Sequence, residues 1–117
     1  MKFLLSVLTL LAILPPVGCG PCSDEVRAEA VSTDKALKAT WFIRNCGATT
    51  DFSTIVSVHR PDDSYRDQGD FVFVARGERR LRLAWTGPMQ LTIECPACQR
   101  SDIFRRVTVL GNIDIVQ

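Results

Sequence analysis

The chain has 117 residues, with 14 Lys and Arg against 13 Asp and Glu, and a formal net charge of +1. This length allows one domain with a modest core and excludes two domains of ordinary size. The charge balance argues against a general nucleic-acid binder and against a strong electrostatic membrane patch.

The first segment, MKFLLSVLTLLAILPPVGC, has the pattern of a signal peptide. Lys2 precedes an apolar run over residues 3–14, and Pro15 and Pro16 then break the run. The run is shorter than the roughly 20 residues that a permanent membrane helix needs, and no later stretch approaches that length. We therefore predict a cleaved signal peptide over residues 1–18 and an exported protein.

The residues around the predicted cleavage point indicate a lipid anchor. Cys19 follows the small residue Gly18, and lipoprotein signal peptidase recognises a small residue before a cysteine that carries diacylglycerol. Pro16 departs from the leucine usual in that pattern, so cleavage by ordinary signal peptidase is the alternative, which gives a soluble periplasmic or secreted protein. We favour lipidation of Cys19 and a lipidated tether over residues 19–24. Gly20 in place of an Asp then predicts the outer membrane in a Gram-negative cell.

The next segments predict strands. SDEVRAEA, residues 23–30, could be read as helix from its Glu and Ala content. The stretches over residues 35–46 and 52–60 then alternate apolar and polar residues with the period of two that half-buried strands show. DFVFVARG, residues 70–77, is a continuous apolar run that suits a strand buried on both faces.

Alternation continues to the end of the chain. RRLRLAW, residues 79–85, and QLTIEC, residues 90–95, each place every second apolar side chain on one face. In residues 104–117 a Gly-Asn pair between apolar pairs is a two-residue hairpin signal. The fold class that we predict is all-β: a single small antiparallel domain of about seven strands over residues 25–117, as a meander, a sandwich or a partly open barrel.

Five cysteines leave one unpaired in an oxidising compartment, and lipidation of Cys19 would remove the odd one. The four that remain allow three pairings, and the closeness of the two in ECPAC limits the choice. We favour two disulfides: Cys22–Cys46 and Cys95–Cys98. CGPC, which contains Cys19 and Cys22, matches the thioredoxin tetrapeptide, but no strand precedes it in the mature chain, so we do not interpret it as a redox centre.

Residues 44–58 contain the run CGATT followed by a strand that begins near Phe-Ser-Thr. This run resembles a family of small uncharacterised bacterial exported proteins and lipoproteins, and weaker matches extend over most of residues 22–117. The resemblance supports export and the Cys22–Cys46 pairing, and it implies no activity. The chain departs from the family at residues 32–35, where Ser-Thr-Asp-Lys replaces a Pro-Asp-Gly turn, and at CPAC, which is outside the family pattern. The motif residues are Cys46, Gly47, Ala48, Thr49 and Thr50.

No motif predicts catalysis. His59, the single histidine, lacks neighbours spaced for a triad, so we expect it at the surface or rim. The aspartates of residues 60–70 lack the ligand spacing of a calcium loop. RGERR, residues 76–80, could bind an anionic surface, but charged hairpin tips also protect sheet edges. We expect CGATT to be a structural corner, with Thr49 and Thr50 bonded to the backbone.

The function that we predict is a non-enzymatic, lipid-anchored β module of the bacterial envelope that acts by binding or as a structural element. We expect no cofactor, no metal and no nucleic-acid partner; its protein or envelope partner is left open. One alternative is a thiol-disulfide protein that uses Cys95 and Cys98. Another is an inhibitor of a wall-degrading enzyme, although none of the motifs of such inhibitors is visible.

Overall fold

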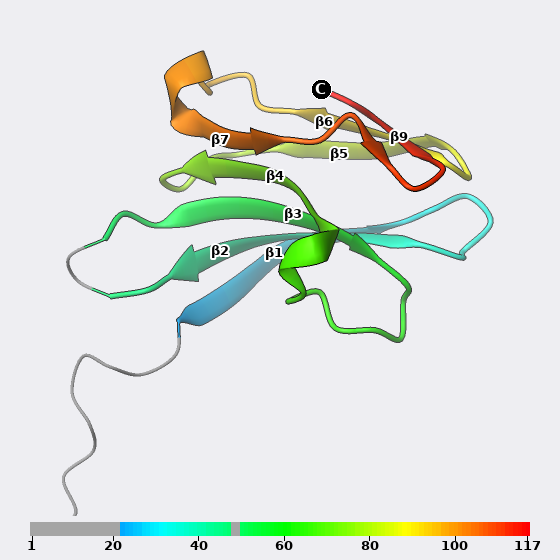
Figure 1. Cartoon of the computed structure of the whole chain (residues 1–117), viewed down its shortest axis with the longest axis horizontal. Coiled ribbons are helices and arrows are strands. Elements are labelled where there is room, and N and C mark those ends of the chain that lie inside the picture. Colours follow the sequence, from blue (N-terminus) through cyan, green and yellow to red (C-terminus); the bar gives the residue numbers. More distant parts are fainter. Residues whose placement is uncertain (1–21, 48–49) are drawn as a thin grey trace, which may run out of the picture.

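The computed structural model describes residues 22–47 and 50–117 (Figure 1). The predicted signal peptide, Cys19, Ala48 and Thr49 lie outside these described residues. Within them, none of the helices has the length and apolar character needed to cross a membrane.

The described residues form two β-sheets and two single-turn 3-10 helices (Figure 1). The predicted all-β fold is confirmed. One sheet has the strand order β1-β2-β3-β4-β7 and the other the order β5-β6-β9-β8. The elements of the first sheet are β1 (Ser23–Val31), β2 (Lys38–Asn45), β3 (Ser53–His59), β4 (Phe71–Arg76) and β7 (Ile103–Arg106). Those of the second are β5 (Arg82–Gly87), β6 (Gln90–Glu94), β8 (Val109–Leu110) and β9 (Ile113–Val116), and the 3-10 helices are η1 (Gln68–Asp70) and η2 (Arg100–Asp102).

The two sheets stack face to face over one apolar core, which makes the fold a sandwich. In strands such as β6 and β9, alternate side chains point into it, as the period of two in the sequence predicts. Leu91 and Ile93 of β6 are 0% and 2% exposed, for example, while Glu94 beside them is exposed. The buried members of this core are Ala39, Val56, Val58, Val72, Phe73, Ala75, Leu81, Leu91, Ile93, Ile113 and Ile115.

A smaller apolar cluster lies on the outer face of the five-stranded sheet. Phe42, Ile55 and Phe71 are buried there, and Tyr65 from the loop of residues 60–70 covers them. The rings of Phe42 and Tyr65 have centroids 4.6 Å apart. Because this loop folds back over the sheet, β3 is buried on both faces rather than half-buried, and the loop is part of the packed structure.

Three features differ from the prediction. Residues 23–30 form β1 rather than a helix, because pairing along all of β2 outweighs the helical preference of Glu and Ala. A register shift between Val26 and Ala28 breaks the alternation that would have identified the strand. The described residues form nine strands where about seven are expected, and β6 pairs with β9 in parallel rather than antiparallel. Since β1 starts at Ser23, the predicted tether overlaps the sheet by two residues.

Both sides of the sandwich are closed by contacts between the sheets. On one side the indole Nε1 of Trp85 in β5 donates to the carbonyl of Ala30 in β1 over 2.8 Å. On the other side the chain crosses directly from β7 to β8. Val107, at this crossing, continues the pairing of β7 with β4, because its amide donates to the Val72 carbonyl at 2.9 Å. The Gln117 side chain also donates to the carbonyls of Val72 and Val107. These bonds fix the relative position of the sheets.

The β1–β2 turn is irregular, as the missing Pro-Asp-Gly predicts. Lys35 has a φ of 64°, the left-handed region that favours glycine. The Asp34 carboxylate accepts hydrogen bonds from the Ala36 amide and the Ser32 hydroxyl, and these bonds lower the pKa of Asp34. The turn is therefore held by side-chain bonds in place of glycine.

Candidate functional site

Both disulfides lie at the same end of the sandwich, which we call the disulfide end. It comprises Cys22–Cys46, Cys95–Cys98, and the loop residues 46–47, 50–52, 77–81 and 95–102 (Figure 1). The registers place these segments together, because β1 begins, β2 ends, β4 ends and β6 ends there. A hydrogen bond also joins two of these loops, because the Gly77 amide donates to the Phe52 carbonyl.

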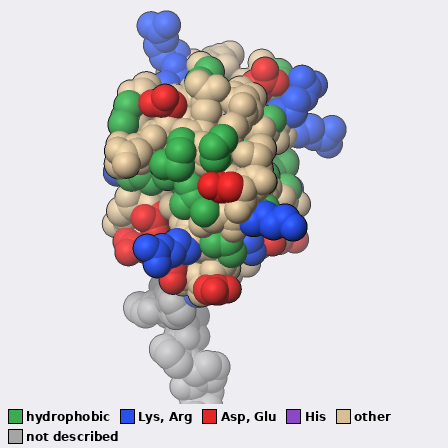
Figure 2. Space-filling view, turned by 90° about the vertical axis from the view of Figure 1, so that its right-hand side faces the viewer, with side chains coloured by type: hydrophobic (Ala, Val, Ile, Leu, Met, Phe, Trp, Pro, Cys, Tyr) green, Lys and Arg blue, Asp and Glu red, His purple; other side chains and the backbone are tan. Residues whose placement is uncertain are grey.

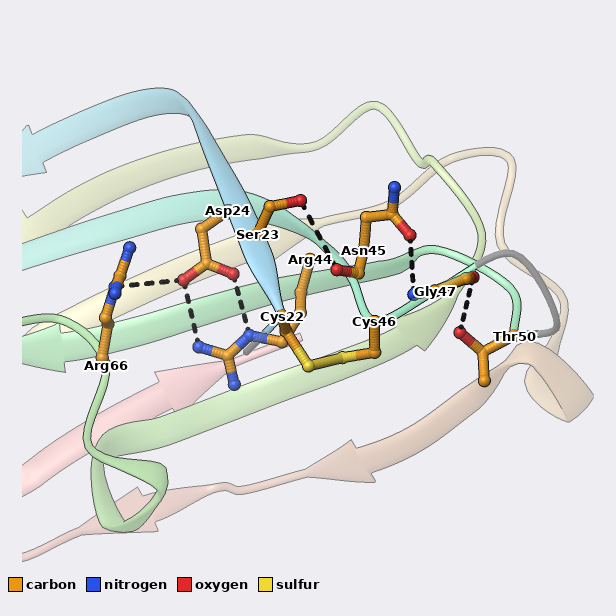
Figure 3. Close-up of a disulfide and its surroundings, with 9 residues drawn as sticks. All are labelled: Cys22, Ser23, Asp24, Arg44, Asn45, Cys46, Gly47, Thr50 and Arg66. Carbon is orange, nitrogen blue, oxygen red and sulfur yellow. Dashed lines mark hydrogen bonds and ion pairs between the residues drawn. A yellow bond between two sulfur atoms is a disulfide. The ribbon is translucent and has the colours of Figure 1, made fainter. Parts of the chain in front are cut away.

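The Cys22–Cys46 disulfide closes the start of β1 onto the end of β2. Its Cα atoms are 4.1 Å apart, and the next residues, Ser23 and Asn45, are register partners (Figure 3). The bond encloses the β1–β2 hairpin, with a sequence separation of 24. It therefore fixes the first described residue of the chain to the sheet.

The described part of the CGATT run forms a corner between β2 and β3. The Asn45 carboxamide oxygen accepts from the Gly47 amide at 3.0 Å, and Gly47 has a φ of 129°. The Thr50 hydroxyl donates to the Gly47 carbonyl at 3.1 Å (Figure 3). Glycine is needed at this φ, and the Thr50 hydroxyl has the backbone role that we predict for it.

A buried carboxylate lies beside the disulfide. The Asp24 side chain is 1% exposed, and the Arg44 guanidinium donates to both its oxygens, at 2.8 and 3.1 Å (Figure 3). Arg66, from the loop over the outer face, approaches the same carboxylate at 3.2 Å, and the Tyr65 hydroxyl donates to it at 3.4 Å. The hydrogen bonds to Asp24 raise the pKa of Arg44. This cluster joins β1, β2 and the loop.

The Cys95–Cys98 disulfide spans the turn after β6. The Cys98 amide donates to the Cys95 carbonyl at 3.1 Å, and both residues are partly exposed. An open hollow of about 540 Å³ lies against this turn, and Arg100, Ile103 and Arg106 are among the residues that line it. The disulfide thus lies beside an open hollow at the surface.

His59 is at a strand end, as predicted, but it is buried rather than at the surface. It is 7% exposed; the Thr40 hydroxyl lies 2.7 Å from its Nε2, and the Arg60 carbonyl lies 2.7 Å from its Nδ1. A proton on Nδ1 donated to that carbonyl leaves Nε2 to accept from Thr40, so a neutral ring satisfies both contacts. These bonds give His59 a structural role.

The acidic residues do not gather into a metal site in the described ranges 22–47 and 50–117, where no three His, Cys, Asp or Glu side chains are placed to hold a metal ion. Asp67 instead caps η1, since its carboxylate accepts from the Gly69 amide. Burial raises the pKa of Asp70, and the neighbouring Asp67 and Asp63 add to this effect.

Sequence reasoning missed the Asp24 cluster. Asp24 and Arg44 are register partners on adjacent strands, so the pair could be recognised only if residues 23–30 were read as a strand. Arg66 and Tyr65 reach it from a loop more than 40 residues away along the chain, a contact that no local pattern encodes.

Comparison with known proteins adds no assignment: no family model, curated protein or solved structure matches this chain.

Proposed function

We propose that the protein is a lipid-anchored, non-enzymatic module of the bacterial cell envelope, which binds a partner or supports structure there. Residues 1–18 act as the export signal, and Cys19 carries the lipid. The domain that begins at Cys22 is then presented at the membrane surface through a tether of two residues, Gly20 and Pro21.

The observation that carries this proposal is the pairing of the cysteines. Four of the five form two disulfides, which leaves Cys19 as the odd thiol, three positions before the first disulfide-bonded residue. Disulfides persist in exported proteins, where the compartment is oxidising. An exported protein avoids a stray reactive thiol if that cysteine is modified, and a Gly-Cys junction after an apolar signal suits lipidation.

The test is the intact mass of the full chain recovered from bacterial membranes. We expect loss of residues 1–18, the mass of an acylated Cys19, and the loss of four hydrogens from the two disulfides. The matched control is Cys19→Ser, which leaves the four disulfide-forming cysteines in place. Because serine cannot carry the diacylglycerol that lipoprotein signal peptidase requires, this variant should lack the acyl mass and retain residues 1–18. An unacylated Cys19 in the wild-type protein would refute the proposal.

The open hollow beside Cys95 and Cys98 favours a second candidate function, thiol-disulfide exchange with a partner protein. The reduction potential of this pair decides between the two, because structural disulfides of exported proteins lie below about −300 mV. A value above about −230 mV, in the range of known exchange proteins, would support exchange. Cys22→Ser/Cys46→Ser isolates the pair for this measurement, provided that the variant stays folded.

A further inference from the structure

The disulfide end carries a surplus of positive charge. Every acidic side chain of its loops is already in an ion pair: Asp51 with Arg76, Glu78 with Arg27, and Asp102 with Arg79. Glu94, where β6 enters this end, pairs with Arg82. Within the described ranges, four exposed arginines of this end and of the adjoining β7 have no acidic partner within 4.0 Å. We call them the arginine rim: Arg80, Arg100, Arg105 and Arg106.

Three of the four rim arginines line hollows that lie against the Cys95–Cys98 turn. Arg80 lines a shallow hollow on one side of the turn, with Pro96 and Ala97. Arg100 and Arg106 line the hollow on the other side. Arg80, Arg100 and Arg106 therefore gather around this turn, and Arg105 precedes Arg106 on β7.

The even charge of the whole chain conceals this arrangement. Two turns lie at the end of the sandwich opposite the disulfide end: residues 32–37, after β1, and residues 60–70, after β3. Together these turns carry five aspartates and only three basic residues. Figure 2 views the opposite end and shows side chains of both signs around a group of apolar ones. The net charge thus does not describe the local charge of either end.

Exposed aromatic side chains accompany the rim. Phe104, beside Arg105 on β7, is 59% exposed, and Phe52 in the neighbouring loop is 38% exposed. The Arg76 guanidinium lies 5.3 Å from the centroid of the Phe104 ring. Arginines with exposed aromatic rings suit the boundary between lipid headgroups and acyl chains, since the charge stays in the polar layer while the ring enters the apolar one.

We propose that the disulfide end docks on a membrane surface through anionic phospholipid headgroups, whose phosphates the arginine rim binds. The planar guanidinium group fits phosphate oxygens in a two-pronged geometry. This inference rests on the proposed function, because a lipid on Cys19 would hold Cys22, and with it the disulfide end, toward the bilayer. The rim then sets the orientation of the domain, so that the opposite end of the sandwich faces away from the membrane.

The test uses the chain from residue 19 onward with Cys19→Ser, which contains every described strand and both disulfides but no lipid. Sedimentation with phosphatidylcholine vesicles, with and without phosphatidylglycerol, measures its binding. We expect binding only with phosphatidylglycerol, and loss of binding at about 1 M salt, where charges are screened within about 3 Å. Each arginine near an anionic surface contributes about 1 kcal/mol, or about fivefold in partition.

Two double variants of equal net charge separate the rim from total charge. Arg80→Asn/Arg100→Asn should weaken vesicle binding about 25-fold, whereas Lys35→Asn/Arg60→Asn, two exposed sites at the opposite end, should change it less than about threefold. Near-ultraviolet circular dichroism checks that both variants are folded.

Equal losses in the two variants, or equal binding to both kinds of vesicle, would overturn the proposal. So would tighter binding of the wild-type chain to an anionic polysaccharide than to the vesicles, because the rim's ligand would then be a glycan. The vesicle assay needs no lipid on Cys19, and the intact-mass experiment does not involve the rim. Failure of either proposal can therefore be recognised separately.

Discussion

The Asp24–Arg44 pair offers the most direct test of how the start of the domain is held. Asp24 is 1% exposed and Arg44 is 18% exposed at the side chain, and two hydrogen bonds join them. Removing one partner of a buried pair costs about 3–5 kcal/mol, because the other charge is left without compensation. Replacing Arg44 and replacing Asp24 should cost different amounts of stability, since Arg44 keeps some contact with water and Asp24 has almost none.

We therefore expect Arg44→Met to cost about 3–4 kcal/mol and Asp24→Leu about 2–3 kcal/mol. The loss of Arg44 leaves Asp24 with Tyr65 and the more exposed Arg66. The double variant Asp24→Leu/Arg44→Met removes both charges, so its cost should fall short of the sum by about 1–3 kcal/mol.

Urea unfolding at pH 7, with the disulfides intact, measures these costs through the fluorescence of Trp41 and Trp85. Arg82→Met is the control, because Arg82 and Glu94 form an exposed pair that contributes less than about 1 kcal/mol. A cost for Arg44→Met no larger than that of the control, or additive costs in the double variant, would refute the role given to the buried pair.

Three further predictions concern the first half of the domain. Cys22→Ser/Cys46→Ser should lower the free energy of unfolding by about 3 kcal/mol, because the loop between the cysteines is no longer closed in the unfolded chain; an unchanged urea midpoint contradicts this. Lys35→Gly should raise the free energy of unfolding by about 0.5–1 kcal/mol, which corresponds to about 2–8 °C in melting temperature, since glycine adopts the positive φ of residue 35 without strain. A lower melting temperature would contradict the strain at this position. Asp34→Asn should lower the melting temperature at pH 7, because the lowered pKa of Asp34 marks stabilisation that exists above pH 4 or so and is lost in acid. Asp70→Asn should raise it, because burial raises the pKa of Asp70 and the charged form destabilises the fold. Both differences should disappear below about pH 3 in thermal melts across pH, and equal signs at pH 7 would contradict the assignment.

Periodicity predicts the core strands well because each of them buries one regular face. In β6 the residues expected on one face, Leu91 and Ile93, are those that the core encloses, and so is Leu81, which directly precedes β5. The same reasoning fails for β1, where seven of nine residues are exposed and a register shift interrupts the alternation. An edge strand with little buried surface has no apolar pattern to read, so local Glu and Ala preferences dominate.

The contacts that define the candidate site depend on residues far apart in the sequence. Thr40 of β2 forms a hydrogen bond with the ring of His59 in the neighbouring strand β3. Arg44 from β2 and Arg66 from a loop form ion pairs with Asp24. Residue types alone identify these groups as polar, and only the strand register decides that they are buried and paired. The arginine rim is similar, because composition gives the number of charges and the fold decides where they gather.

The parallel pairing of β6 with β9 has a consequence for the order of assembly. Residues 95–112 lie between these two strands in the sequence, and they include β7, which belongs to the other sheet. Strand β6 can therefore pair on its second edge only after β9 is present. Ile113 and Ile115 also complete the core from β9. In the export that we propose, the chain crosses the membrane from its N-terminus, so strands β1–β4 can pair first, while the β5–β6 hairpin lacks its third strand until β9 has crossed. Pairing with β9 thus completes the second sheet, and loss of β9 should leave an unpaired edge of β6 exposed to other chains.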